Sequence, residues 1–303
     1  HLIDEIARVS EFRVLVYTGG EPMVRRDIFD LMRHSKEAGL INVIATNGTL
    51  ITEEEAYRLK EEGVVCAAVS LDSWRYEVHD YVRNRGNSYE LAMRGIRELK
   101  KAGIPLQINC TAMQYNFGDL NELLEVVDGL GSGIMLMYQL VPVGRGGAIR
   151  DATLNVNDNE RLLKFLAEKQ KEVSTIVEPV AGPQYWPYLM ERKDLRNAAW
   201  LSMGEHVFHG CAAGRGFVYI KANGEVWPCP FVEVNAGNVR EQSFGHIWRD
   251  SPVFSDLRNR ETALKGRCGA CKYKTMCGGC RGRALAYTGD YLAEDPSCFI
   301  IDR

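Results

Sequence analysis

The sequence lacks three features that would place the protein in a specialised class. Its 37 Lys and Arg residues are balanced by 40 Asp and Glu residues, for a net charge of −3, so no basic surface for nucleic acid is indicated. Its apolar runs are strand-sized, so no membrane-spanning segment is expected. No apolar signal segment follows His1, and short repeats are absent. We therefore expect a cytoplasmic globular protein of 303 residues that binds neither nucleic acid nor membrane.

Cysteine is common but unevenly distributed. The chain has nine cysteines, and an odd number without a secretion signal argues against a disulfide framework. Cys66 and Cys110 lie in apolar runs and are predicted to be small buried hydrophobic residues. The other seven follow residue 210: Cys211, Cys229, Cys268, Cys271, Cys277, Cys280 and Cys298. This second group needs a separate explanation.

The spacing of these later cysteines indicates metal binding. Cys268 and Cys271 form one Cys-x-x-Cys pair, and Cys277 and Cys280 form another. Such pairs let two thiolates converge on a soft metal ion or an iron–sulfur cluster. Seven ligands suggest two sites, one of which lacks a ligand or takes it from elsewhere. Spacing alone does not distinguish zinc from iron–sulfur, so a non-enzymatic scaffold stabilised by zinc stays open.

The first half of the chain alternates short apolar runs with amphipathic stretches. The strands are predicted at 12–20, 41–48, 64–72, 104–113 and 133–142. The helices are predicted at 25–40, 52–63 with Thr52 as N-cap, 88–103, 117–131 and 157–173. This alternation favours an α/β fold with a parallel sheet, in which ligands bind at the carboxyl ends of the strands.

Glycines and polar residues follow most of the predicted strands. These segments are 19–22 (Gly-Gly-Glu-Pro), 46–48 (Thr-Asn-Gly), 70–72 (Ser-Leu-Asp) and 139–145. Any one of them is explained as well by an ordinary turn. Their recurrence after strand upon strand favours a binding site at this edge of the sheet.

The second half changes character near residue 200, where we place a domain boundary. The helix at 157–173 is predicted to begin at Asn157 or Asp158, and 181–194 is interpreted as a linker or a lid. Beyond Cys211 the chain is rich in cysteine and glycine. Asn223 and Gly224 lie between two apolar runs and predict a β-hairpin.

These motifs together resemble those of a known family. "YTGGEP", "TNG" and "SLDS…HDYVR" resemble the radical S-adenosylmethionine (SAM) enzymes, and the cysteine array resembles their SPASM extension. Six of the seven cysteines and Gly224 fit the SPASM pattern, whereas Cys280 comes one residue early. The resemblance covers nearly the whole chain. It implies a partial (β/α)6 barrel with its linker at 1–199 and a domain that binds auxiliary clusters at 200–303.

One motif of that family is missing. Its members hold a SAM-binding 4Fe–4S cluster on a CxxxCxxC motif before the GGEP turn, and this sequence contains none. We therefore expect that the N-terminal segment with this third cluster is missing from the chain.

The resemblance implies roles for residues at the strand ends. The turn of Gly19, Gly20, Glu21 and Pro22 would receive the amino group of SAM, and Thr46 and Asn47 would line its pocket. Ser70 and Arg83 would hold its carboxylate, a contact that suits arginine. Asp72 would lie near the ribose, and Leu140 and Val141 would flank the adenine. The alternatives are a plain turn, a surface charge for Arg83 and a helix cap for Asp72.

The resemblance also divides the cysteines between two auxiliary 4Fe–4S clusters. Cluster I would be held by Cys211, Cys229 and Cys280. Cluster II would be held by Cys268, Cys271, Cys277 and Cys298. This assignment splits the pair of Cys277 and Cys280, and it leaves the fourth position of cluster I open, or filled by substrate or another residue.

The implied reaction is reductive cleavage of SAM to a 5′-deoxyadenosyl radical, with an electron donor such as ferredoxin or flavodoxin. The tail resembles most the branch that modifies tetrapyrroles, for example by decarboxylating iron-coproporphyrin or in haem d1 maturation. Peptide maturases of the mycofactocin type are the alternative. Candidate contacts for a tetrapyrrole are Arg145, Arg215, Arg281, Arg283, Tyr138, Tyr185 and Trp186, with His206 and His209 as candidate ligands of iron. Surface charge, core packing or a structural histidine is an equally good explanation for each of them.

Overall fold

The computed structural model describes residues 1–192 and 210–300. The chain divides into two compact units. The first comprises His1–Tyr138 and Glu172–Glu178, and the second comprises Gln139–Lys171 and Pro179–Arg303. The predicted domain boundary near residue 200 lies outside the described residues and stays a prediction. Among the described residues no helix combines the length and apolar character that crossing a membrane requires.

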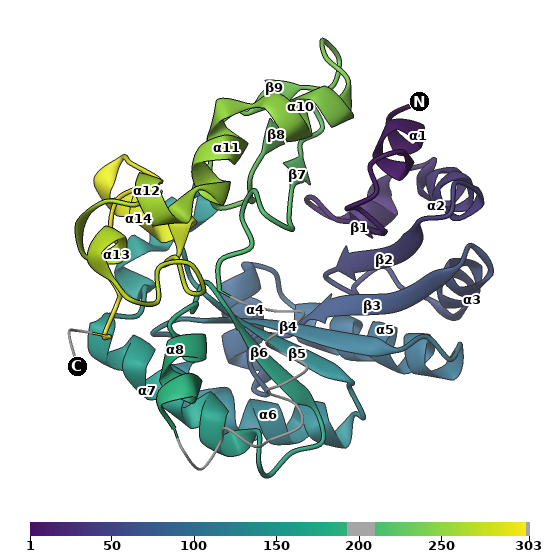
Figure 1. The fold of residues 1–303 in the computed structure, drawn as a ribbon. Helices are drawn as coiled ribbons and strands as arrows, with labels where there is room; N and C mark the ends of the chain where they lie inside the picture. Colours follow the sequence, from purple (N-terminus) through teal and green to yellow (C-terminus); the bar gives the residue numbers. More distant parts are fainter. Residues whose placement is uncertain (193–209, 301–303) are drawn as a thin grey trace. The chain divides into compact units, whose positions relative to one another are not determined.

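The main sheet has six strands in the sequence order β1-β2-β3-β4-β5-β6 (Figure 1). They are β1 (Val14–Tyr17), β2 (Ile41–Thr46), β3 (Val64–Ser70), β4 (Leu106–Ala112), β5 (Ile134–Gln139) and β6 (Ile176–Val180). The registers of β1 with β2, β2 with β3 and β3 with β4 are parallel. The predicted parallel sheet is therefore confirmed, and β6 extends it beyond the five strands located from the sequence.

Helices alternate with the strands of the first unit. They are α1 (Leu2–Ala7), α2 (Ile28–Glu37), α3 (Glu53–Glu61), α4 (Tyr76–Arg83), α5 (Ser88–Lys101) and α6 (Leu120–Gly129). α2 packs on β2, α3 on β3, and α5 on β3 and β4 (Figure 1). Thr52 caps α3 as predicted, since its hydroxyl accepts from the Glu55 N–H and the Glu55 side chain accepts from the Thr52 N–H.

The second unit carries short elements around the cysteines. Its helices are η3 (Gly144–Ala152), α7 (Val156–Lys169), α8 (Tyr185–Glu191), α10 (Phe244–Asp250), α11 (Pro252–Arg258), α12 (Arg260–Ala263), α13 (Gly266–Ala270) and α14 (Arg281–Thr288). The strands β7 (Tyr219–Ile220), β8 (Glu225–Trp227) and β9 (Gly237–Asn238) form a small sheet. β7 and β8 pair antiparallel on either side of Asn223 and Gly224, so the predicted hairpin is confirmed.

Three local predictions are corrected. α7 is capped by Asn155, whose side chain accepts from the Asp158 N–H at 3.0 Å, and not by Asn157 or Asp158. The segment interpreted as a linker or a lid contains the helix α8, and several residues of this helix are buried in the core. The helix can form despite Pro187 because this residue lies in the first turn, where proline is tolerated. Cys110 is fully buried as predicted, whereas Cys66 is half-buried.

Candidate functional site

Glu21 connects the turns that follow β1 and β2. One carboxylate oxygen accepts from the Thr46 hydroxyl at 2.6 Å, and the other accepts from the Asn47 N–H at 2.7 Å. The same side chain accepts from the Met23 N–H and caps a short helix, η1 (Pro22–Val24). The structure therefore brings the Gly-Gly-Glu-Pro and Thr-Asn-Gly turns together at the carboxyl ends of neighbouring strands.

Asp72 and Arg83 are paired with each other after β3. The Nε of Arg83, in the last turn of α4, lies 2.6 Å from Oδ2 of Asp72. Asp72 is 1% exposed, and its Oδ1 accepts from the Thr111 N–H at 2.9 Å. Because both oxygens of Asp72 are engaged, the geometry favours an anchoring role for it, and its contact with a ribose stays a prediction.

His79 supports the same corner of the first unit. Its Nδ1 accepts from the Asp72 N–H at 3.1 Å. Burial lowers the pKa of His79, opposed by the nearby Asp72 carboxylate and reinforced by Arg83. The neutral imidazole is therefore the form that the fold accommodates, and this form can accept the Asp72 N–H. Ser70 ends β3, half-buried, two residues before Asp72.

The last two SAM candidates lie in the second compact unit. Leu140 and Val141 directly follow β5, Leu140 half-buried and Val141 fully buried. Their proposed contact with adenine stays a prediction.

Four cysteines line one hollow in the second unit. They are Cys268, Cys271, Cys277 and Cys298, called here the second cysteine set. Burial raises the pKa of Cys277, and the neighbouring Cys298, Asp295 and Cys268 raise it further. Burial also raises the pKa of Cys298 to about 11. Unligated, these two thiols are neutral; a bound cation would displace their protons.

The remaining three cysteines form a separate group. Burial raises the pKa of Cys229, and the thiol groups of Cys211 and Cys280 raise it further. Burial raises the pKa of Cys280 to about 12. Cys211, Cys229 and Cys280 are called here the first cysteine set. The resemblance assigns Cys277 and Cys280 to different clusters, and this division of the seven cysteines stays a prediction.

Backbone N–H groups point at several of these sulfurs. The sulfurs of Cys268, Cys271 and Cys280 each accept an N–H at 3.4 Å, from Asp295, Tyr273 and Arg283 respectively. The sulfur of Cys277 accepts from Gly279 at 3.5 Å. Hydrogen bonds to ligand sulfurs stabilise a thiolate-held cluster and influence its reduction potential.

The four thiols of the second cysteine set are a suitable ligand set for a metal group. In residues 1–192 and 210–300, no group of three His, Cys, Asp or Glu side chains is placed to hold a single metal ion. Four cysteine thiolates are the ligands that hold a 4Fe–4S cluster, so the residues around the hollow fit that group.

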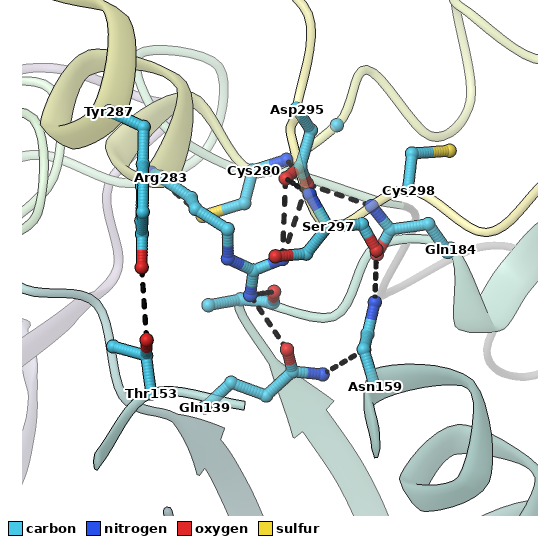
Figure 2. Close-up of polar contacts among 12 residues, drawn as sticks. Gln139, Thr153, Asn159, Gln184, Cys280, Arg283, Tyr287, Asp295, Ser297 and Cys298 are labelled. Atoms are coloured by element: carbon cyan, nitrogen blue, oxygen red, sulfur yellow. Dashed lines mark hydrogen bonds and ion pairs between the residues drawn. The ribbon is translucent and has the colours of Figure 1, made fainter. Parts of the chain in front are cut away.

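A buried polar network lies beside both cysteine sets (Figure 2). The Arg283 guanidinium donates to Asp295 at 3.3 Å and to the Gln139 side chain at 2.7 Å. Asp295 also accepts from the Gln184 amide and from the Cys280 N–H, at 2.7 and 2.8 Å. Asp295 therefore contacts the first set through the Cys280 backbone and the second through its own N–H to the Cys268 sulfur.

Sequence reasoning missed this network. Gln139, Asn159, Gln184 and Asp295 are far apart along the chain, and no motif connects them. The available signal was the position of Asp295, three residues before Cys298 in the cysteine-rich tail.

The structure corrects four of the predicted substrate contacts. Arg281 and Arg283 are 0% and 3% exposed and bond to groups within their own unit. Tyr185 and Trp186 are 1% and 4% exposed, in the core. These four side chains serve packing and internal hydrogen bonding instead.

The other substrate candidates keep some exposure. Arg145 is exposed, Tyr138 is half-buried, and Arg215 donates to the Thr275 carbonyl at 3.4 Å. His206 and His209 lie outside the described residues.

Comparisons with known proteins identify the family. The family model "Radical SAM superfamily" matches residues 1–127, and the SPASM model, "Iron-sulfur cluster-binding domain", matches residues 211–272. The "AdoMet-dependent heme synthase" of Methanosarcina barkeri (strain Fusaro / DSM 804) is 39% identical over 302 residues, which cover 98% of this chain and 85% of that protein. The chain belongs to the radical SAM superfamily. As a member, it is an enzyme of radical chemistry whose cofactors are SAM and 4Fe–4S clusters.

This radical SAM enzyme is also similar to a peptide maturase in sequence and to a solved structure in fold. The "Mycofactocin maturase MftC" of Mycobacterium ulcerans (strain Agy99) is 31% identical over 305 residues, covering 98% of this chain and 77% of that protein. The solved structure "Native anSMEcpe with bound AdoMet" has a TM-score of 0.69 at 18% identity, covering 98% of this chain and 84% of that one. The likeness to the solved structure concerns the fold, and it supports the predicted partial barrel.

Proposed function

We propose that this radical SAM enzyme modifies a tetrapyrrole side chain, through oxidative decarboxylation of iron-coproporphyrin propionates or a related step towards haem or haem d1. The observation that carries the proposal is the 39% identity to a haem synthase over nearly the whole chain. The mycofactocin maturase, at 31% identity, makes a peptide substrate the second candidate.

The SAM pocket is assigned to the strand ends. Glu21 holds the two glycine-containing turns in place, so their backbone carbonyls can receive the ammonium of SAM. Arg83 is fixed by Asp72 through Nε, and since arginine carries five N–H donors, its other face can take the SAM carboxylate. The proposed residues of the first unit are Gly19, Gly20, Glu21, Pro22, Thr46, Asn47, Ser70, Asp72 and Arg83. Leu140 and Val141 of the second unit stay the candidates for contact with adenine.

Each cysteine set is assigned one auxiliary 4Fe–4S cluster. The second set supplies four thiolates around one hollow, which completes the ligation of a cluster. The first set supplies three, so one iron of its cluster is left for another ligand or for substrate. In both, the raised thiol pKa values mean that cluster binding releases protons.

The cofactors would supply the difficult chemistry, since one-electron reductive cleavage of SAM would release methionine and provide the 5′-deoxyadenosyl radical for hydrogen abstraction. Abstraction from a propionate, followed by loss of carbon dioxide and one electron, leaves a vinyl group. The departing electron needs an acceptor, a role that suits an auxiliary cluster. A ferredoxin or flavodoxin is the proposed donor for SAM cleavage, and a cytoplasmic location stays a prediction.

The test is a turnover assay on natural-length protein purified without oxygen. With SAM, a reductant and iron-coproporphyrin, we expect 5′-deoxyadenosine and carbon dioxide together. If 5′-deoxyadenosine forms without loss of carbon dioxide or a change in the porphyrin, the substrate assignment is wrong. If a precursor peptide is modified instead, the second candidate replaces it. Zinc in place of iron and sulfide would contradict the cluster assignment itself.

A further inference from the structure

Arg260 is a buried cation without the partners that such a group normally has. It begins α12 and is 2% exposed. Its Nη2 donates to the Cys211 carbonyl, whereas Nε and Nη1 have no hydrogen-bond partner among the described residues. Two neighbouring cations, Arg215 and Arg281, lower the pKa of Arg260 further. A buried charge in this state is strongly unfavourable unless a group outside the described residues satisfies it.

Arg260 lies where the two cysteine sets meet. The Cys211 N–H donates to the Cys277 carbonyl at 3.0 Å, which joins one cysteine of each set through the backbone. Gly278, with φ of +67°, lies against the guanidinium, and a Cβ there would come 2.6 Å from Nη1. Because glycine has no Cβ, the guanidinium of Arg260 can lie close to the loop between Cys277 and Cys280.

One cysteine of each set influences the pKa of Arg260. Burial lowers its pKa to about 10, and the side chains of Cys211 and Cys277 act in the opposite direction. An iron–sulfur cluster with its cysteine thiolates is anionic, and its sulfurs accept hydrogen bonds. A cluster is thus the kind of group that would satisfy the unpartnered nitrogens.

Two neighbouring arginines show how Arg260 differs. Arg283 is neutralised by Asp295 at 3.3 Å. Arg281 donates through Nη1 to the Tyr291 and Ala293 carbonyls and through Nη2 to the Cys268 sulfur at 3.6 Å. Arg281 therefore faces the second set, whereas Arg260 is within electrostatic reach of a cysteine from each.

We propose that Arg260 is a shared counter-charge for the two auxiliary clusters, and that its Nε and Nη1 groups donate to their sulfurs and raise both reduction potentials. The step concerned is the addition of one electron to a cluster from a one-electron donor, with no bond formed or broken. Arg260 keeps its proton and favours the more negative, reduced state. The inference rests on the proposed cluster assignment.

The test is a redox titration of the reconstituted, full-length protein with dithionite, followed by electron paramagnetic resonance. Arg260→Met and Arg260→Gln remove the charge. Each is expected to make both auxiliary clusters at least tenfold harder to reduce, a shift of about 59 mV per tenfold for one electron. Arg260→Lys keeps the charge and is expected to restore most of the shift. Arg281→Gln is expected to shift the cluster of the second set alone.

Arg258 provides the matched control. It lies on the preceding helix and donates to the Trp248 and Gly214 carbonyls. Arg258→Gln removes a nearby cation with ordinary partners, so both potentials are expected to stay at their wild-type values. Equal shifts in Arg258→Gln and Arg260→Gln would overturn the proposal, as would unchanged potentials in Arg260→Met at full iron content.

Cluster content separates the remaining outcomes. If all three Arg260 variants lose iron and sulfide while Arg258→Gln keeps them, Arg260 is required for cluster binding. The proposal that it sets the reduction potentials is then wrong. If the wild-type protein itself holds zinc and no sulfide, the cluster assignment fails, and this inference fails with it. If the wild type holds its clusters and only the potentials fail to respond, the cluster assignment stands and Arg260 alone is misassigned.

Discussion

The strand-end site of the first unit and the cysteine sets of the second accommodate buried charge in different ways. At the strand ends, Arg83 is neutralised by Asp72, and the Glu21 carboxylate is satisfied by Thr46 and Asn47. Beside the cysteines, Arg260 retains unpartnered donors among the described residues, and burial raises the pKa of several thiols. The charged groups of the first site are paired within the polypeptide, whereas those of the second would be satisfied by the proposed clusters.

The largest expected effect comes from removing a ligand of the second set. Cys268→Ala or Cys298→Ala should lose about half of the auxiliary iron and lower the thermal stability of the cysteine-rich unit, because ligation contributes folding energy there. Iron analysis and thermal unfolding measure both. Cys66→Ala, at a half-buried cysteine of the first unit, is the control and should keep its iron. Full iron in both ligand variants would contradict the assignment.

Arg83→Ala is expected to weaken SAM binding. Loss of a charge-assisted hydrogen bond costs about 1.5–3 kcal/mol, which is about tenfold or more in the dissociation constant. Equilibrium binding of SAM to the anaerobic protein measures it. Arg75→Ala removes a neighbouring arginine that is paired with Asp119, and it should leave SAM affinity unchanged. Equal affinities of wild type and Arg83→Ala would remove Arg83 from the pocket.

The pH dependence of the free energy of unfolding tests whether His79 is buried in its neutral form beside Asp72. Burial holds the pKa of His79 below its ordinary value of 6.5, so the unfolded chain binds this proton more readily than the folded one. Its contribution to stability is full above pH 6.5 and is lost as the pH falls through the lowered pKa. Denaturant unfolding at a series of pH values should show this loss in wild type and a flatter profile in His79→Gln. Parallel profiles would show that another group is responsible.

The smallest expected effect concerns a helix cap remote from both sites. Thr52→Ala removes one half of the capping box of α3 and should cost about 1 kcal/mol. Denaturant unfolding measures this cost. Iron content and SAM affinity should not change. A change in SAM affinity would mean that the strand-end site depends on α3, and a change in iron content would mean that the cysteine sets do.

The sequence predicted those parts of the fold that are encoded locally. The apolar runs located five of the six strands, and Thr52 and Asn223-Gly224 marked a helix start and a hairpin. β6 was missed because Pro179 interrupts its apolar run, and the segment with α8 was interpreted as a linker or a lid because it is aromatic and contains proline. Proline weakens the local pattern of an element that tertiary packing nevertheless stabilises.

The sequence also predicted some residues of the candidate sites and missed the contacts between them. The glycine turns and the cysteines carry recognisable motifs, so their positions followed from the sequence. The pairing of Arg83 with Asp72, and of Arg283 with Asp295 and Gln139, depends on how distant segments pack. The same limit explains why Arg281 and Arg283 were expected to meet a substrate, since a charged residue in a sequence does not reveal whether the fold buries it.

The most direct test of the account is the iron and sulfide content of Cys277→Ala, Cys280→Ala and the double variant. These two cysteines are separated by two glycines, yet the proposed assignment places them in different sets. The account predicts that each single variant loses one auxiliary cluster and that the double variant loses both. If the double variant retains as much iron and sulfide as either single variant, the two cysteines share one cluster, and the division into two sets is wrong.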